Sequence, residues 1–267
     1  MTLTLTTAVP ERDRWDRPVI DGQPHTRIST LAKTLSDQTS LIAWASRMTA
    51  VGLAQSDDLV AAVATTSATD RYALDKLVER AQERAQARRG ATMGTALHSA
   101  TQMADEGVSE ALWPAGVRAD VEAYRDACAH HKLRPLACEV FVVCPELRAA
   151  GTLDRIMQGP TRALVADLKT SGNPDSAKYE ALAWAIQVAT YAHGHPWHHD
   201  HGHMTWDQLG LPQPDLRRGL VIHITQGTAK VAMHSVDLTL GWQAAHLATQ
   251  VRDMRKAKTL TTIGAKK

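Results

Sequence analysis

Cysteine is scarce in this chain, with three residues in a length of 267. Cys128, Cys138 and Cys144 form no CxxC pair, and an odd number of thiols cannot be fully paired within one chain. This usage fits a reducing compartment, and we expect a cytoplasmic protein. The simplest role for the three side chains is that of small buried hydrophobes.

Long apolar runs are lacking too. No stretch approaches the roughly eighteen apolar residues of a membrane span, and the N-terminus lacks the basic start and apolar run of a secretory signal. Neither sign of charge is in excess, because the formal net charge is +2. The total therefore indicates no partner, and any basic surface must be local. We expect a soluble intracellular protein that does not bind a membrane.

The N-terminal third has the composition of an arm followed by helices. Residues 1–26 mix prolines and glycine with charges, which predicts a loose arm, and residues 27–90 form a helical N-terminal region. Gly90 and Gly94 are expected to interrupt the helical pattern before it resumes. Apolar spacing predicts helices over 30–55, 57–69, 70–87, 95–103 and 113–131.

Farther along the chain the hydrophobic period changes from helix to strand and back. The predicted elements are strands at 136–143, 151–157 and 163–169, a helix at 178–193, a hairpin of 219–225 with 230–236, and a helix at 239–257. This order predicts one α/β or α+β domain over residues 91–258, with a central mixed sheet flanked by helices. Residues 195–214 are expected to be an insertion loop, and 259–267 a basic tail.

Chemically active side chains gather on two neighbouring predicted strands. Asp167 and Lys169 are two positions apart, so in a strand their side chains share a face. Asp154 lies on the preceding strand, and a tight turn through Gly159 and Pro160 could bring it beside Asp167. The pattern therefore predicts two converging carboxylates with a lysine next to them.

Two adjacent carboxylates repel each other unless a cation lies between them, and a hard divalent ion with oxygen ligands is the usual solution. Magnesium or manganese is the economical choice. Such an ion can polarise a phosphoryl oxygen and lower the pKa of a water, while Lys169 orients that water or stabilises developing charge. This chemistry is phosphodiester hydrolysis.

The sequence resembles the RecB-type branch of the PD-(D/E)xK nucleases, close to the CRISPR-associated exonuclease family and its bacteriophage relatives. The resemblance rests on four ordered pieces between residues 94 and 191. They are GTALHS with His98, GTLDRI with Asp154, ADLKTSG with Asp167 and Lys169, and QVATY with Gln187 and Tyr191. Each piece alone is weak, but four in the correct order on fitting elements are specific.

The resemblance implies a restriction-endonuclease-like core and a role for each matching residue. His98, Asp154 and Asp167 would be metal ligands together with the carbonyl of Leu168, and Lys169 would be the catalytic lysine. Gln187 and Tyr191 would contact the substrate or support the site.

Glu139 is a further candidate in the first strand. Strand alternation places Glu139 on the same face as Phe141, and an acid among apolar neighbours is costly unless it is paired or bound to a metal. The resemblance implies an auxiliary acidic role for this residue in catalysis.

One feature departs from the family. CRISPR-associated members often hold an iron–sulfur cluster through one upstream and three C-terminal cysteines, and no cysteine follows Cys144 here. We therefore expect no iron–sulfur cluster. The resemblance implies a DNA nuclease, an exonuclease on single strands or duplex ends, in phage or mobile-element recombination and repair, with a recombination protein as a possible partner.

Other interpretations stay open. Asp167 and Lys169 taken alone also fit an ordinary surface ion pair. A non-catalytic DNA-binding or adaptor module could retain the nuclease fold. The segment HPWHHDHGH at 195–203 could make the chain a histidine-rich metal-binding protein, although its composition favours adventitious zinc or nickel binding over a built site. The basic C-terminal end could contact DNA phosphates or be a solvated helix end.

Overall fold

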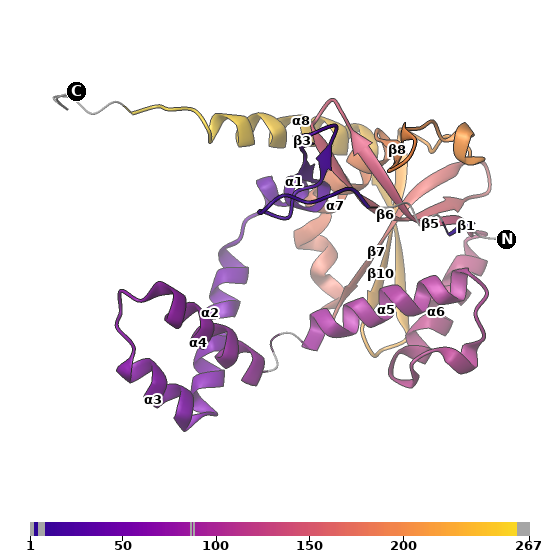
Figure 1. The fold of residues 1–267 in the computed structure, drawn as a ribbon. Helices are drawn as coiled ribbons and strands as arrows, with labels where there is room; N and C mark the ends of the chain where they lie inside the picture. The colour runs from indigo at the N-terminus through magenta and orange to yellow at the C-terminus, as the bar shows by residue number, and fades with distance from the viewer. Residues whose placement is uncertain (1–2, 5–8, 86, 88, 261–267) are drawn as a thin grey trace. The chain divides into compact units, whose positions relative to one another are not determined.

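Two compact units divide the chain. The computed structural model describes residues 3–4, 9–85, 87 and 89–260 (Figure 1). The first unit joins Met1–Ser36 to Ala100–Lys267, and the second is Asp37–Ser99. Of the predicted basic tail, residues 261–267 lie outside the described residues.

The second unit consists of helices. They are α2 (Thr39–Ala54), α3 (Asp57–Thr65), α4 (Arg71–Arg84) and the first part of α5 (Arg89–Asp105). Leu59, Leu77 and Ala81 form its small core. Helix α5 runs without a break through Gly90 and Gly94, where an interruption was expected. An isolated glycine costs only about 1 kcal/mol in a helix, which does not end an otherwise favourable one.

A mixed sheet forms the centre of the first unit. In the part of the chain that the structure describes it has nine strands, in the order β11-β10-β7-β6-β5-β8-β9, with β1 beside β5 and β4 beside β6. Strands β5, β6 and β7 form the predicted antiparallel meander, and β10 lies parallel to β7. The bounds are β1 Leu3–Thr4, β4 Thr26–Arg27, β5 Arg134–Cys144, β6 Ala149–Gln158, β7 Ala163–Ser171, β8 His195–His198, β9 Gly202–His203, β10 Arg218–Thr225 and β11 Lys230–Asp237.

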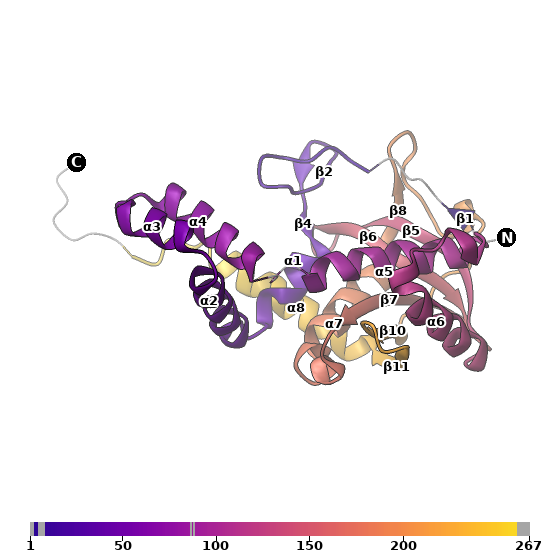
Figure 2. The same ribbon diagram turned by 90° about the horizontal axis from the view of Figure 1, so that it is seen from below.

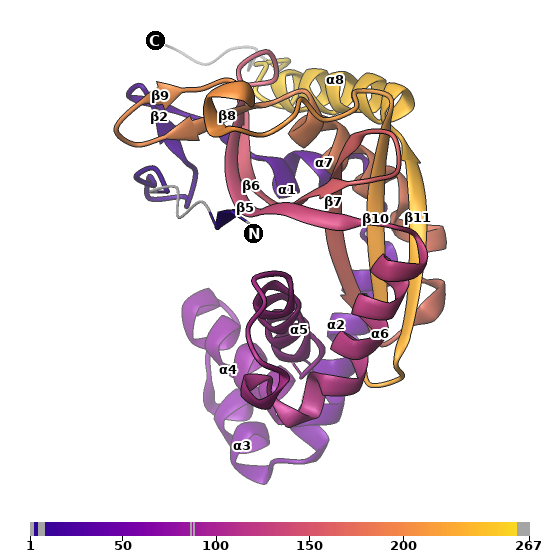
Figure 3. The ribbon, with the colours of Figure 1, turned by 90° about the vertical axis from the view of Figure 1, so that its right-hand side faces the viewer.

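Helices cover both faces of this sheet (Figures 2 and 3). Helices α1 (Ile28–Ala32), α7 (Ala177–Ala192) and α8 (Leu238–Met254) lie on one face. Helix α6 (Arg118–His130) and the C-terminal end of α5 contact the other. The predicted α/β fold, a restriction-endonuclease-like core with a mixed sheet between helices, is confirmed.

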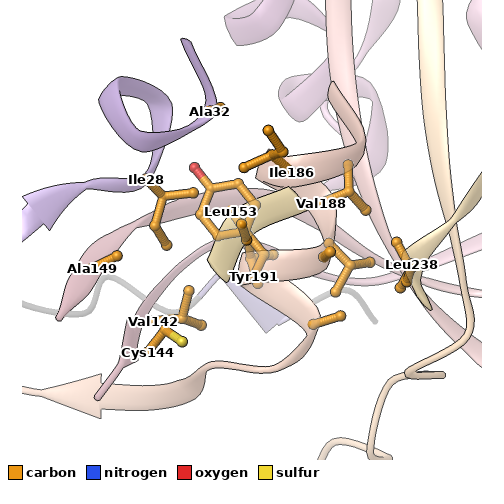
Figure 4. Close-up of a cluster of buried hydrophobic side chains, with 14 of the residues drawn as sticks. Ile28, Ala32, Val142, Cys144, Ala149, Leu153, Ile186, Val188, Tyr191 and Leu238 are labelled. Carbon is orange, nitrogen blue, oxygen red and sulfur yellow. The ribbon is translucent and has the colours of Figure 1, made fainter. Parts of the chain in front are cut away.

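The main core lies between the sheet and the helices α1, α7 and α8 (Figure 4). Ile28, Leu153, Ile186, Tyr191 and Leu238 are among its buried side chains. The helices α7 and α8 pack closely at Gly241. A Cβ added there would lie 2.4 Å from the carbonyl oxygen of Ala185. This packing fixes α7 against the strand that carries Asp167.

Two segments expected to be irregular contain strands. Within the predicted arm, β2 (Val19–Ile20) pairs with β3 (Gln23–Pro24), and Ile20 packs against Phe141 and Trp197. The predicted insertion loop at 195–214 begins with β8, which pairs with β5 at the sheet edge, and continues into β9. Backbone pairing and buried apolar side chains outweigh the proline and glycine content in both segments.

Candidate active site

Asp154 and Asp167 lie where two neighbouring strands separate. The pairing of β6 with β7 runs from Gln158↔Ala163 to Arg155↔Ala166 and stops one step before these two aspartates would face each other. At that point Oδ2 of Asp154 accepts the backbone N–H of Leu168 at 2.7 Å. A side-chain contact thus replaces the next step of the ladder and holds Asp154 beside the Asp167–Lys169 segment.

Asp167, Lys169 and Gln187 form a closed triangle of polar contacts. The ammonium Nζ of Lys169 lies 2.5 Å from Oδ2 of Asp167 and donates to Oε1 of Gln187 at 2.9 Å. The amide Nε2 of Gln187 donates to Oδ1 of Asp167 at 3.1 Å. Strand alternation explains the first contact, since residues two apart share a face, and α7 covers that face. The structure therefore brings the predicted acid, base and helix residue together.

Burial sets the protonation behaviour of this triangle. The side chain of Asp167 is 2% exposed, and this burial raises its pKa to about 6 despite the Lys169 ammonium beside it. The neighbouring Asp154 carboxylate adds to the rise. For Lys169, the Asp167 and Asp154 charges outweigh burial and raise the pKa, so this lysine is charged at neutral pH. The pair is thus a buried ion pair rather than a solvated one.

Tyr191 supports the site from within the core. It lies one helical turn after Gln187, whose Nε2 contacts the phenol oxygen at 3.4 Å. Its ring packs over Gly151, where an added Cβ would lie 3.4 Å from the phenol oxygen. Gly151 lies three residues before Asp154, and its lack of a side chain leaves room for the tyrosine ring.

Glu139 lies opposite Asp154 but on an irregular stretch of strand. The flanking register pairs Cys138↔Arg155 and Val140↔Leu153 place Glu139 across from Asp154. Burial and the Asp154 charge raise the pKa of Glu139 to about 7. Glu139 is therefore close enough to Asp154 and Asp167 for their charges to affect its protonation.

The expected side-chain alternation does not hold across Glu139. Its φ of +53° is left-handed, a conformation uncommon outside glycine. Ala137 and Val140, three positions apart, consequently pack into the same core cluster. The expectation that Glu139 shares a face with Phe141 assumed a regular strand, and the strand is not regular at Glu139.

Arg155, next to Asp154 in sequence, forms a network that the sequence did not indicate. The arginine is 2% exposed, and its Nε donates to Oδ2 of Asp105 at 2.6 Å. Tyr124 donates to the same carboxylate, and the guanidinium lies 3.8 Å from Glu139. These contacts join α5 and α6 to the strand that carries Asp154. The sequence shows that an arginine follows the aspartate of GTLDRI, whereas its burial and its partners come only from the structure.

His98 belongs to the other compact unit. It lies on α5 within Asp37–Ser99, whereas the residues above belong to the first unit. Its role as a metal ligand stays a prediction from the sequence.

The donors of the first unit fit a hard divalent ion. Asp154 and Asp167 offer carboxylate oxygens, and Oδ2 of Asp167 is buried beside the Lys169 ammonium. Among those residues, no three His, Cys, Asp or Glu side chains are gathered closely enough to hold a metal by themselves. Magnesium commonly takes one or two carboxylates, keeps several waters and shares phosphate oxygens of its substrate. The carboxylates suit such a sparsely held ion.

The histidine-rich segment forms the hairpin of β8 and β9. This hairpin pairs with β5, not with the strand that carries Asp167 and Lys169. The rings of His198 and His201 stack with centroids 4.9 Å apart, and His203 lies 3.8 Å from Asp21. Among the described residues, which include this hairpin, no three His, Cys, Asp or Glu side chains gather closely enough to hold a metal ion. These contacts give no support to a histidine-based metal centre.

The three cysteines are buried and free of disulfides. Burial raises the pKa of Cys128 and Cys138 to about 12 and that of Cys144 to about 11. Thiols with such values are poor nucleophiles at neutral pH. They act as small hydrophobes, as expected.

Comparison with known proteins agrees with this geometry. No helix of the described residues is long and apolar enough to cross a membrane. No curated protein matches the chain. Residues 67–195 match the family model described as the PD-(D/E)XK nuclease superfamily, a range that contains every predicted site residue and ends before β10. This part of the chain is therefore similar to the PD-(D/E)XK nuclease superfamily.

Proposed function

We propose that this protein is a magnesium- or manganese-dependent DNA nuclease. The observation that carries the proposal is the triangle of Asp167, Lys169 and Gln187, with Asp154 held beside it through the N–H of Leu168. Burying an acid and a base in contact costs solvation that an ordinary surface ion pair does not. A catalytic role for both residues explains why the chain contains this costly buried pair.

Asp154, Asp167 and the carbonyl of Leu168 would hold the ion, and the sequence adds His98 as a further ligand. When bound, a divalent ion polarises the scissile phosphate and lowers the pKa of the attacking water. Glu139 lies across from Asp154 and would take up an auxiliary acidic role at the edge of the site.

Lys169 would act on the nucleophile and on developing charge. Its ammonium is fixed by Asp167 and Gln187, so it needs no rearrangement to present a positive charge. Preorganised charge of this kind stabilises a phosphorane-like transition state and orients water. Gln187 and Tyr191 would keep the lysine and the carboxylate in register from α7.

The finer assignment rests on the resemblance to RecB-type enzymes. We propose an exonuclease that acts on single strands or duplex ends, in recombination or repair of phage or mobile-element DNA, with a recombination protein as its partner. The rival is a non-catalytic DNA-binding adaptor with the same fold.

End-labelled single-stranded, duplex and circular DNA, incubated with the purified protein and manganese, separates these functions. We expect linear DNA to be degraded from its ends, circles to persist, and a chelator to stop the reaction. Cleavage of circles would replace the exonuclease with an endonuclease. DNA binding without cleavage of any substrate under any divalent ion would favour the adaptor.

A further inference from the structure

His223 lies beside the catalytic strand although it is far from it in sequence. It occupies β10, where its register partner on β7 is Lys169. The residue is 2% exposed, and its ring packs 5.6 Å from that of Trp184 on α7. It also lies outside the range of the family match, which ends at residue 195. No role follows for it from the nuclease motifs.

The ring nitrogen of His223 contacts both ends of the turn that links β7 to α7. Its Nε2 lies 2.9 Å from Oγ of Ser171, the last residue of β7, and 3.1 Å from Oγ of Ser176. The two hydroxyls also lie 3.0 Å from each other. Ser176 is the N-cap residue of α7 but makes no capping hydrogen bond with its side chain. Its hydroxyl is used for this cluster instead.

Counting protons indicates which tautomer His223 adopts. The hydroxyl of Ser171 donates its one proton to the carbonyl of Asn173 at 2.6 Å, so its oxygen is left as an acceptor. An Nε2–H on His223 can donate to that oxygen, whereas an unprotonated Nε2 would leave it without this partner. Burial and the nearby His234 lower the pKa of His223, which keeps the ring neutral.

This cluster joins β10 to the two elements that carry Asp167, Lys169 and Gln187. Lys169 lies two residues before Ser171, and Gln187 lies on the helix that Ser176 begins. The Lys169–Gln187 contact of 2.9 Å therefore depends on how the end of β7 is held against the start of α7. The pairing of β10 with β7 fixes the position of the two strands. The side chains of His223, Ser171 and Ser176 fix the turn.

We propose that His223 is a positioning residue of the nuclease, which donates from Nε2 to the Ser171–Ser176 turn and so sets the Lys169 ammonium against Asp167 and Gln187. The inference rests on the proposed nuclease function. The side chain of His223 bonds to Ser171 and Ser176, so its effect on the Lys169 side chain passes through the turn.

Two amide substitutions at His223 separate a placed donor from mere bulk. The amide nitrogen of glutamine reaches about as far from the backbone as Nε2 of histidine, whereas that of asparagine ends near the position of Nδ1. We expect His223→Gln to keep kcat within about threefold. His223→Asn should lower kcat about 10- to 100-fold with KM and manganese affinity within about threefold, because a displacement of the order of 1 Å at a catalytic group has such an effect.

His234→Gln is the matched control. This histidine lies on β11 with its ring 6.2 Å from that of His223, and its Nε2 has no hydrogen-bond partner among the described residues. It should leave kcat unchanged. In the double variant Ser171→Ala with His223→Asn, kcat should be no lower than in the more impaired single variant, since both changes break one link.

The experiment measures kcat, KM and thermal unfolding for these variants, together with ¹⁵N spectra of histidine-labelled, metal-free protein. The spectra should show a neutral Nε2–H tautomer for His223, identified by its loss in His223→Gln. Equal kcat for the unaltered protein and a folded His223→Asn variant would overturn the inference, as would an Nδ1–H tautomer or a fall of kcat in His223→Gln matching that of His223→Asn. If the unaltered protein cleaves no DNA, the proposed function fails instead, and the spectra still test the hydrogen bond.

Discussion

Lys169 and Asp167 stand two positions apart on β7, and their side chains meet with Nζ 2.5 Å from Oδ2. The carboxylate is 2% exposed and the lysine 22% exposed, so neither charge is fully hydrated. Each charge offsets part of the free-energy cost of burying the other, and Gln187 forms a hydrogen bond with both groups. These contacts fix the positions of the two charged groups before a phosphate or a cation binds.

Removing the lysine should separate catalysis from ion binding. We expect Lys169→Ala to lower kcat by about 100-fold or more, because a preorganised charge is lost. Manganese binding at pH 8, measured by calorimetry, should persist, since the carboxylates remain. Lys178→Ala is the control, because that lysine is 70% exposed and pairs only with Asp175 among the described residues. An active Lys169→Ala variant would remove Lys169 from the chemistry.

Ion affinity should rise with pH. The pKa values of about 6 for Asp167 and about 7 for Glu139 mean that both acids are largely protonated at pH 5. An ion binds the deprotonated forms, so affinity should increase from pH 5 to pH 8 and then level off. Calorimetry in two buffers of different ionisation enthalpy should detect proton release at pH 6 and little at pH 8.5. Affinity independent of pH over this range would contradict these assignments.

The same shifts give a sign for stability. An acid whose pKa is raised on folding contributes stability that is complete below its unfolded pKa and is lost as the pH rises through its folded value. The metal-free protein should therefore lose stability between about pH 4 and pH 7 relative to an Asp167→Asn variant, as thermal unfolding at several pH values would reveal.

The ion pair of Arg155 with Asp105 should be needed for folding rather than chemistry. Asp105→Ala leaves a buried guanidinium without its main partner, and we expect a loss of about 3 to 5 kcal/mol in unfolding free energy. Lys256→Ala is the comparison, because Lys256 and its partner Asp253 are 73% and 64% exposed and their pair should be worth at most about 1 kcal/mol. Equal losses in urea titrations would show that burial does not govern these pairs.

Close packing of α7 on α8 should make Gly241 sensitive to a single methyl group. A Cβ there would lie 2.4 Å from the carbonyl oxygen of Ala185, so the helices must move apart. We expect Gly241→Ala to cost about 1 to 3 kcal/mol of stability. Gly116→Ala, where nothing lies within 4 Å of the added atom, is the control. A Gly241→Ala protein as stable as the control would mean that α7 and α8 can separate freely.

Short-range spacing made much of the site predictable. Asp167 and Lys169 share a face because strand side chains alternate, and Gln187 and Tyr191 share one because a helical turn separates them. Asp154 followed from a tight connection between two strands. Each of these relations spans a few residues or one hairpin, so the pattern of the sequence fixes it.

Relations over longer distances were not predictable. His223 meets Ser171 because β10 pairs in parallel with β7 after an intervening helix and hairpin, and no local pattern specifies that register. Glu139 has a left-handed φ that no strand pattern indicates. The pairing of β8 with β5 was hidden by a histidine-, glycine- and proline-rich composition. Tertiary contacts decide all three.

The most direct test of the account is cleavage and binding of the same end-labelled DNA by the unaltered protein and by Asp167→Asn. The substitution keeps the shape of the side chain and removes the charge that would hold the ion. We expect manganese-dependent cleavage by the unaltered protein, none by the variant, and equal or tighter DNA binding by the variant in calcium, since one negative charge fewer faces the phosphates. Cleavage by Asp167→Asn at the unaltered rate would contradict the assignment of this site.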